Sequence, residues 1–292
     1  MCPLGTLTAV HRLIVNADDF GLTTGVNQAV LELRSANALT SATLMATASQ
    51  FNEAVKLSGQ LPSLGVGCHV ILVDGTPALP PSEILSLIDP SSQNGTAFRP
   101  KLSTFVTDLL RGRINDAEIE AEVTAQIKKL QQAGVHVTHL DTHKHTHMFP
   151  GVLRPLVRAA LTCGVKAIRN PFEPNWSLNA TVNAGHVRKM QVRLLRSQSA
   201  TFTAEVNRAG LLTTDGAIGV LATGTLDTQT IRNLLVAMPD GTWELVCHPG
   251  YNDAALQQQN TRLLASRDAE RAALLETIPH ANVDLIHFGQ LA

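Results

Sequence analysis

The chain has 292 residues, of which 44% are hydrophobic and 16% charged, so it can bury the core of one large α/β domain. With 23 basic and 24 acidic residues it has no excess positive charge for nucleic acid, and no apolar run approaches the roughly 20 residues of a membrane span. The N-terminus lacks the segments of a signal peptide and the four cysteines form no CxxC pair, so we expect a cytoplasmic protein.

The most informative stretch is an apolar run, residues 13–17, that ends in two adjacent carboxylates, Asp18 and Asp19. It predicts a buried strand that delivers both carboxylates to its C-terminal end, where Gly21 lets the chain turn away. Neighbouring carboxylates repel unless a positive charge lies beside them or one keeps a proton. A divalent metal on one, with the other free to accept a proton from water, resolves the conflict. The alternative is an aspartate that merely caps the following helix.

Strands and helices alternate along the chain, which predicts parallel βα units. The clearest helix covers 116–133, where Asn115 and Glu118 resemble a capping box. Residues 171–216 contain a basic amphipathic stretch around 186–197 and show little periodicity elsewhere. The remaining expected helices are 24–37, 51–57, 151–162, 228–238 and 257–276, and the remaining strands are 41–46, 65–73, 135–140, 165–169, 217–221, 243–247 and 283–288.

Residues 74–103 interrupt the alternation with five prolines and the polar run 91–95. A loop this long in a compact domain is usually functional or mobile. We interpret it as an insertion into a single domain, 1–292. It is either a lid beside the site or a tolerated surface loop.

Five predicted strands carry a polar group suited to catalysis at or near their C-terminal ends. These groups are Asp18 with Asp19, His69, His143, Arg169 and His248. Their repetition in step with the βα units predicts one site at the C-terminal mouth of a parallel, distorted (β/α) TIM-like barrel.

One aspartate and two histidines are a common ligand set for Zn²⁺ or a similar ion, and they leave space for water and substrate. The second acid can then take a proton from water, while a further histidine protonates a leaving group. Arg169 can hold the base ionised through a charge-assisted hydrogen bond.

Five polar residues alternate at the fourth strand and beyond it, namely His139, Asp141, His143, His145 and His147. In a continuing strand they would share one face, and they cannot all reach one ion. We expect a single ligand, His143. Asp141, His145 and His147 are candidates for substrate contacts, although the last two can equally be loop residues.

Five motifs, in order along residues 11–252, resemble the YdjC-like carbohydrate deacetylases. They are LIVNADDFGLTTGVNQAV, GVGCHVILVDGTPALP, THLDTHKHTHMFP, IRNPFEP and ELVCHPGYND. The resemblance implies metal-dependent removal of an acetyl group from an N-acetylated amino sugar, with one divalent ion, Mg²⁺ or Zn²⁺, as cofactor. It also implies that a homodimer is a common assembly.

The resemblance further implies roles for individual residues. Asp19, His69 and His143 correspond to metal ligands. Asp18 corresponds to the catalytic base, His248 to the general acid, and Arg169 to the residue that orients the base. Two other functions stay open from the residues alone. One is a metal-dependent phosphoesterase on a similar barrel, and the other is a non-catalytic protein that binds sugar or stores metal.

Overall fold

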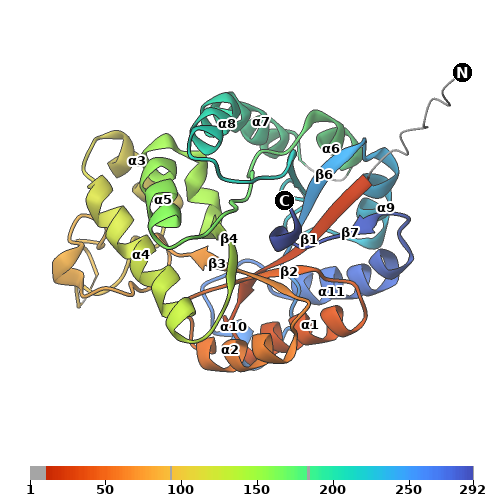
Figure 1. Ribbon diagram of the computed structural model, residues 1–292, viewed down its shortest axis with the longest axis horizontal. Coiled ribbons are helices and arrows are strands. Elements are labelled where there is room, and N and C mark those ends of the chain that lie inside the picture. The colour runs from red at the N-terminus through yellow and green to blue at the C-terminus, as the bar shows by residue number, and fades with distance from the viewer. Residues whose placement is uncertain (1–10, 93, 183–184, 292) are drawn as a thin grey trace, which may run out of the picture.

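A curled parallel sheet of seven strands forms the centre of the computed structural model, which describes residues 11–291 apart from 93, 183 and 184 (Figure 1). The strand order is β4-β3-β2-β1-β6-β5, and β7 pairs with the beginning of β1. The strands are β1 (His11–Phe20), β2 (Ser41–Leu44), β3 (Gly65–Val70), β4 (Val137–Thr142), β5 (Gly216–Ile218), β6 (Gly241–Cys247) and β7 (Asp284–Leu285). The expected distorted barrel of parallel strands is confirmed.

Helices surround this sheet, with α1, α2 and α11 along one flank and α4 and α5 beside β3 and β4 (Figure 1). The helices are α1 (Thr24–Ser35), α2 (Phe51–Gln60), α3 (Leu102–Leu110), α4 (Asp116–Gln132), α5 (Pro150–Thr162), α6 (Asn175–Ala180), α7 (His186–Leu195), α8 (Ser199–Arg208), α9 (Thr228–Ala237), α10 (Ala254–Gln257) and α11 (Ala265–Thr277). None of those in the described part of the chain is both long and apolar enough to span a membrane.

Strand β1 organises the fold because it is the longest of the described strands and lies between β2 and β6. Its side chains from Leu13 to Phe20 are all buried, including the two aspartates at its end. Burial of apolar surface on both faces is what a parallel strand covered by helices requires. As a consequence, Asp18 and Asp19 must find partners inside the protein.

Several boundaries differ from the expected ones. The stretch 165–169 is not a regular strand, because only single bridges join Ile168 to Leu140 and Ala167 to Leu212. The expected helix 257–276 is two helices, α10 and α11, separated by residues 258–264. The unassigned region 171–216 contains α6, α7 and α8.

The insertion 74–103 is bound to α4 by two glutamates of that helix. Glu122 accepts hydrogen bonds from the backbone of Ala78 (2.7 Å) and Leu79 (3.0 Å). Glu118 accepts one from Ser86 (2.7 Å). Asn115 caps α4 through the amide of Ala117, but the expected box does not form because Glu118 has this other partner.

Candidate functional site

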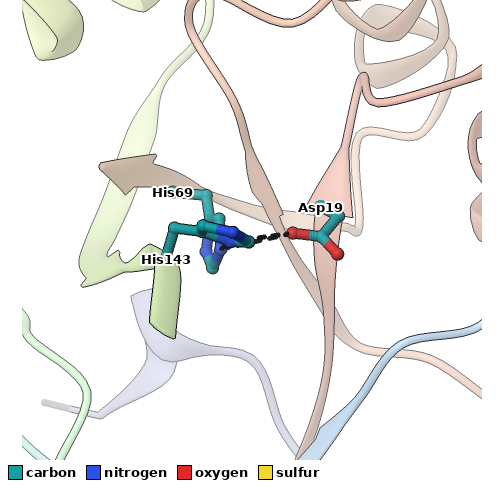
Figure 2. Close-up of side chains that lie close together, drawn as sticks. All are labelled: Asp19, His69 and His143. Carbon is teal, nitrogen blue, oxygen red and sulfur yellow. Dashed lines mark hydrogen bonds and ion pairs between the residues drawn. The ribbon is translucent and has the colours of Figure 1, made fainter. Parts of the chain in front are cut away.

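Asp19, His69 and His143 converge from β1, β3 and the short 3₁₀ segment His143–Met148 that follows β4 (Figure 2). Asp19 Oδ1 lies 3.4 Å from both His69 Nε2 and His143 Nδ1. The two imidazole nitrogens are 3.3 Å apart. A tetrahedral zinc ion with bonds of about 2.0–2.1 Å places its ligand atoms about 3.3–3.4 Å from one another. The spacing of these three atoms therefore fits a shared metal ion.

The hydrogen bonding of Asp19 also fits a metal ligand. Its Oδ2 pairs with Arg267 Nη2 at 2.5 Å. Its Oδ1 is buried and accepts no hydrogen bond from any residue that the structure describes. A buried carboxylate oxygen without a partner is costly, and a cation at this position would compensate it. Burial acts to raise the pKa of Asp19, but Arg267 and the two histidines lower it well below 3.8, so the carboxylate is ionised as metal binding requires.

A local irregularity of β1 brings both aspartates to the same site. Side chains of successive strand residues normally point to opposite faces of a sheet. The pairing of β1 with β2 shifts between Ala17 and Phe20, and Asp19 has a left-handed backbone with φ 65°. Bulges of this kind re-aim side chains next to active sites, and aspartate tolerates the left-handed region better than most residues.

Asp18 has a full set of hydrogen-bond donors around it. Arg169 donates to Oδ2 at 2.9 Å and to Oδ1 at 2.7 Å. Asn16 donates to Oδ1 at 3.0 Å, and the Thr43 hydroxyl lies 3.4 Å from the same oxygen. Burial acts to raise the pKa of Asp18, but Arg169 and neighbouring histidines lower it well below 3.8. Asp18 is therefore a buried carboxylate that is ionised at neutral pH.

Arg169 is itself fully buried and serves three carboxylates. Besides Asp18 it pairs with Asp141 at 2.5 Å and with Glu244 at 2.7 Å. One guanidinium carries too little charge for three carboxylates. Burial raises the pKa of Glu244 to about 7. Arg169 opposes this shift only in part, because it also pairs with Asp18 and Asp141.

Asp141 lies directly behind His69. Its Oδ1 is 2.8 Å from His69 Nδ1, and its Oδ2 is the partner of Arg169 and accepts from Thr43 at 3.1 Å. A carboxylate on one imidazole nitrogen fixes the tautomer and directs the other nitrogen outward. Here it directs His69 Nε2 toward Asp19 and His143. Both oxygens of Asp141 thus already have partners within the protein.

His248 lies on the other side of Asp18, at the end of β6. Its Nε2 is 3.7 Å from Asp18 Oδ2. Its backbone amide donates to Glu270 Oε2 at 2.6 Å. Burial lowers the pKa of His248 to about 4, although Asp18 and Asp19 oppose the shift, so the imidazole is neutral at pH 7. The side chains of His143 and His248 keep 20% and 12% of their exposure, which leaves the site open to solvent.

His145 and His147 lie on a sharply turned segment beside this group. Lys144 and His145 have left-handed backbones, with φ 57° and 52°, so the strand pattern stops at Thr142. His147 Nδ1 is 2.7 Å from Thr142 Oγ1. His145 Nδ1 and His147 Nε2 are buried and have no hydrogen-bond partner among the described residues. Burial, with a smaller contribution from Arg169, lowers the pKa of His145 to about 3.

The structure thus brings together Asp18, Asp19, His69, Asp141, His143, Arg169 and His248. It adds three charged residues that the sequence did not single out, Glu244, Arg267 and Glu270. Glu244 had a weak signal, because it is a lone carboxylate within an otherwise apolar strand. Arg267 and Glu270 had none, since α11 has the ordinary mixture of charged and apolar residues found in an amphipathic helix.

Comparisons with known proteins find relatives that cover most of the chain. A carbohydrate deacetylase from Thermoanaerobacter pseudethanolicus is 28% identical over 264 residues, covering 90% of each chain. A chitooligosaccharide deacetylase from Salmonella paratyphi C is 29% identical over 248 residues, covering 84% of each chain. Among solved structures, a proposed cellobiose-phosphate cleavage protein from Enterococcus faecalis superposes with a TM-score of 0.77 at 25% identity, covering 97% of this chain and 99% of that one.

The fold extends to more distant proteins. A lactam utilization protein from Thermus thermophilus has a TM-score of 0.52 at 14% identity, covering 94% of this chain and 99% of that one, which shows a common fold only. The family described as YdjC-like protein matches residues 12–281, nearly the whole chain, and this confirms the resemblance seen in the motifs. The chain belongs to the YdjC-like protein family.

Proposed function

We propose that the protein is a metal-dependent hydrolase that removes the N-acetyl group from an N-acetylated amino sugar or oligosaccharide and releases acetate. The observation that carries the proposal is the orphaned Oδ1 of Asp19, which lies 3.4 Å from two imidazole nitrogens and on the residue next to an ionised, fully hydrogen-bonded carboxylate. The names of the relatives supply the substrate class, since they are carbohydrate and chitooligosaccharide deacetylases.

In this proposal Asp19, His69 and His143 hold one divalent ion. Two nitrogens and one carboxylate oxygen form a set that Zn²⁺ accepts readily, whereas Mg²⁺ prefers oxygen ligands. When bound, such an ion polarises the acetamido carbonyl and makes water a stronger acid. Asp141 keeps His69 in the tautomer that presents Nε2.

Asp18 accepts the proton of the attacking water. Its contacts with Arg169 keep it ionised and correctly oriented, but they also make it a weak base. His248, neutral at rest and 3.7 Å from Asp18, is placed to take that proton on Nε2 and give it to the departing amine nitrogen. His145 and His147 are proposed contacts for the sugar, and binding would have to expose their unpartnered nitrogens, Nδ1 and Nε2, which are buried in this structure.

The surroundings of Arg169 favour an amide hydrolase over a two-metal phosphoesterase. A second group of potential ligands exists, formed by Asp18, His69 and Asp141. Arg169 already pairs with both of those aspartates, so its guanidinium occupies the position that a second cation would take. Two-metal phosphoesterases require both ions to clamp the reacting oxygens.

The test is acetate release from N,N′-diacetylchitobiose by the metal-stripped protein, alone and after addition of Zn²⁺ or Mg²⁺. We expect release only with metal, and about 10²–10⁴-fold slower release from the Asp18→Asn variant. Nitrophenyl phosphate serves as the comparison substrate. Hydrolysis of the phosphate without release of acetate from any N-acetylated sugar would reject the proposal.

A further inference from the structure

Helix α11 contacts two parts of the candidate site, the proposed metal ligand Asp19 and the histidine His248. Its buried face carries two charged residues three positions apart, Arg267 and Glu270, and each is only 1% exposed. Residues at i and i+3 are neighbours on a helix surface. Charged side chains are almost never buried to this degree unless they are paired. Their partners therefore explain why they are there.

The guanidinium of Arg267 contacts the carbonyl of Leu263 and the carboxylate of Asp19. Its Nε donates to the carbonyl of Leu263 at 3.1 Å, and its Nη2 pairs with Asp19 Oδ2 at 2.5 Å. Its backbone carbonyl accepts from Gly250 at 3.3 Å, which ties α11 to the segment that follows His248. The guanidinium occupies one oxygen of Asp19 and leaves the other facing the two histidines.

Glu270 makes the equivalent connection to His248. Its Oε2 accepts from the backbone amide of His248 at 2.6 Å, and its Oε1 accepts from Gly224 at 3.2 Å. These bonds fix the first residue after β6 to a loop that follows β5. The position of the His248 imidazole relative to Asp18 depends on this anchored backbone.

We propose that Arg267 and Glu270 are positioning residues, through which α11 sets Asp19 for one-oxygen metal binding and sets His248 for proton transfer. The inference rests on the proposed function, because it assumes that Asp19 binds the metal and that His248 transfers the proton. Neither residue contacts the reacting atoms. Each acts through the residue that it holds.

The two positions make separable predictions. Without Arg267 the carboxylate of Asp19 is free to rotate, because its Oδ2 loses the guanidinium that holds it. Loss of such outer partners typically costs about 10–100-fold in metal affinity. Loss of one Glu270 bond leaves the metal ligands untouched and displaces His248, so it lowers turnover with metal affinity unchanged.

The same helix supplies matched controls. Arg271 pairs with Glu32 at 2.9 Å and lies over the ring of Tyr251. Glu276 pairs with Arg232 at 2.7 Å, and both of these side chains are more than half exposed. Neither control touches the candidate site, and an exposed pair such as that of Glu276 with Arg232 contributes little to stability.

The first experiment measures Zn²⁺ dissociation constants of the full chain by competition with a chromophoric chelator, for wild type, Arg267→Met, Arg267→Lys and Arg271→Met. We expect Arg267→Met to bind about 10–100-fold more weakly, Arg267→Lys to recover part of the loss, and Arg271→Met to match wild type. Visible spectra of the Co²⁺-loaded forms report the ligand geometry. A changed spectrum in Arg267→Met alone is the expected result.

Equal Zn²⁺ affinity in Arg267→Met and wild type would overturn the role of Arg267. So would an equal loss in Arg271→Met, which would show a general effect on the helix. If Arg267→Met fails to fold, the comparison of Arg267→Lys with Arg271→Met decides. A wild-type chain that binds no metal would reject the proposed function together with the inference, whereas tight binding in every variant rejects the inference alone.

The second experiment compares Glu270→Gln with Glu276→Gln at saturating Zn²⁺ on N,N′-diacetylchitobiose. We expect Glu270→Gln to lower kcat about tenfold or more with KM and Zn²⁺ affinity unchanged, because glutamine retains only one acceptor oxygen. Glu276→Gln should behave as wild type. Unchanged kcat in Glu270→Gln would overturn the role of Glu270, and so would a lower kcat accompanied by a raised KM and weaker Zn²⁺ binding.

Discussion

Two adjacent carboxylates of β1 have opposite surroundings. Asp18 receives three hydrogen bonds, one from Asn16 and two from Arg169, and both of its oxygens are satisfied. Asp19 has one oxygen on Arg267 and the other without a donor among the described residues. The two residues are of the same type and adjacent in the sequence, so the difference in what they can bind comes from their hydrogen-bond partners. A carboxylate with donors on both oxygens is held in place, whereas one with a free oxygen is suited to bind a cation.

Metal removal should have the largest effect on this comparison. We expect a chelator to reduce acetate release by about a thousandfold or more, because Lewis-acid stabilisation is worth several kcal/mol. Returning Zn²⁺ at about 100 times its dissociation constant should stabilise the fold by about 2.7 kcal/mol. Activity assays and thermal unfolding check the two results. Full activity in chelator would remove the distinction between the two aspartates.

Exchange of each aspartate for asparagine separates the two roles. Asp18→Asn should lower kcat by about 10²–10⁴ while the protein binds Zn²⁺ as tightly as wild type, because only proton transfer is lost. Asp19→Asn should weaken Zn²⁺ binding and activity together. Steady-state kinetics and chelator competition on both variants provide the measurement. Weaker Zn²⁺ binding in Asp18→Asn would contradict the assignment.

The support behind His69 should have a smaller effect. Asp141→Asn removes the charge that orients His69 Nδ1, and we expect a loss of about 10–100-fold in Zn²⁺ affinity. Asp108→Asn is the control, since Asp108 pairs with Arg99 and Arg113 outside the site. Chelator competition on both variants measures the difference. Equal affinities would show that His69 needs no such support.

The smallest effect concerns the surplus negative charge around Arg169. The pKa of Glu244 is about 7 in the folded protein, raised by burial from 4.5, so the folded state binds a proton that the unfolded chain has lost. Stability from this group is present below pH 4.5 and is lost as the pH rises through 7. Relative to Glu244→Gln, wild type should lose about 1 kcal/mol between about pH 6 and pH 7.5.

Urea unfolding of the metal-free proteins at these two pH values measures that loss. A difference between wild type and Glu244→Gln that stays constant with pH would show that Glu244 is ionised throughout. In that case Arg169 balances all three of its carboxylates.

The sequence was sufficient for features that depend on local pattern. Apolar runs followed by polar residues located β1, β3 and β6, and in a parallel sheet their ends must share one edge. The stretch 165–169 was predicted as a strand because it is apolar, but only tertiary pairing decides whether such a run forms a ladder, and here single bridges form. The bulge at Asp19 likewise depends on the pairing with β2.

The residues that support the site were beyond prediction for a related reason. Arg267 reaches Asp19 across 248 positions of sequence, and no local periodicity encodes a contact at that separation. Glu270 appears in the sequence as one of several charged residues of an amphipathic helix. Only the packing of α11 beneath β1 and β6 shows that these two side chains are buried and paired.

The left-handed backbone of Asp19 restricts how an inert, substrate-trapping form of this protein can be engineered. Most side chains have a steric cost of roughly 1–2 kcal/mol at such a φ, while glycine, asparagine and aspartate escape most of it. Alanine scanning at this position would mix strain with loss of the ligand. Asparagine removes the negative charge of the metal ligand and tolerates the left-handed backbone. It is therefore the cleaner choice for crystallising a complex with intact acetylated sugar.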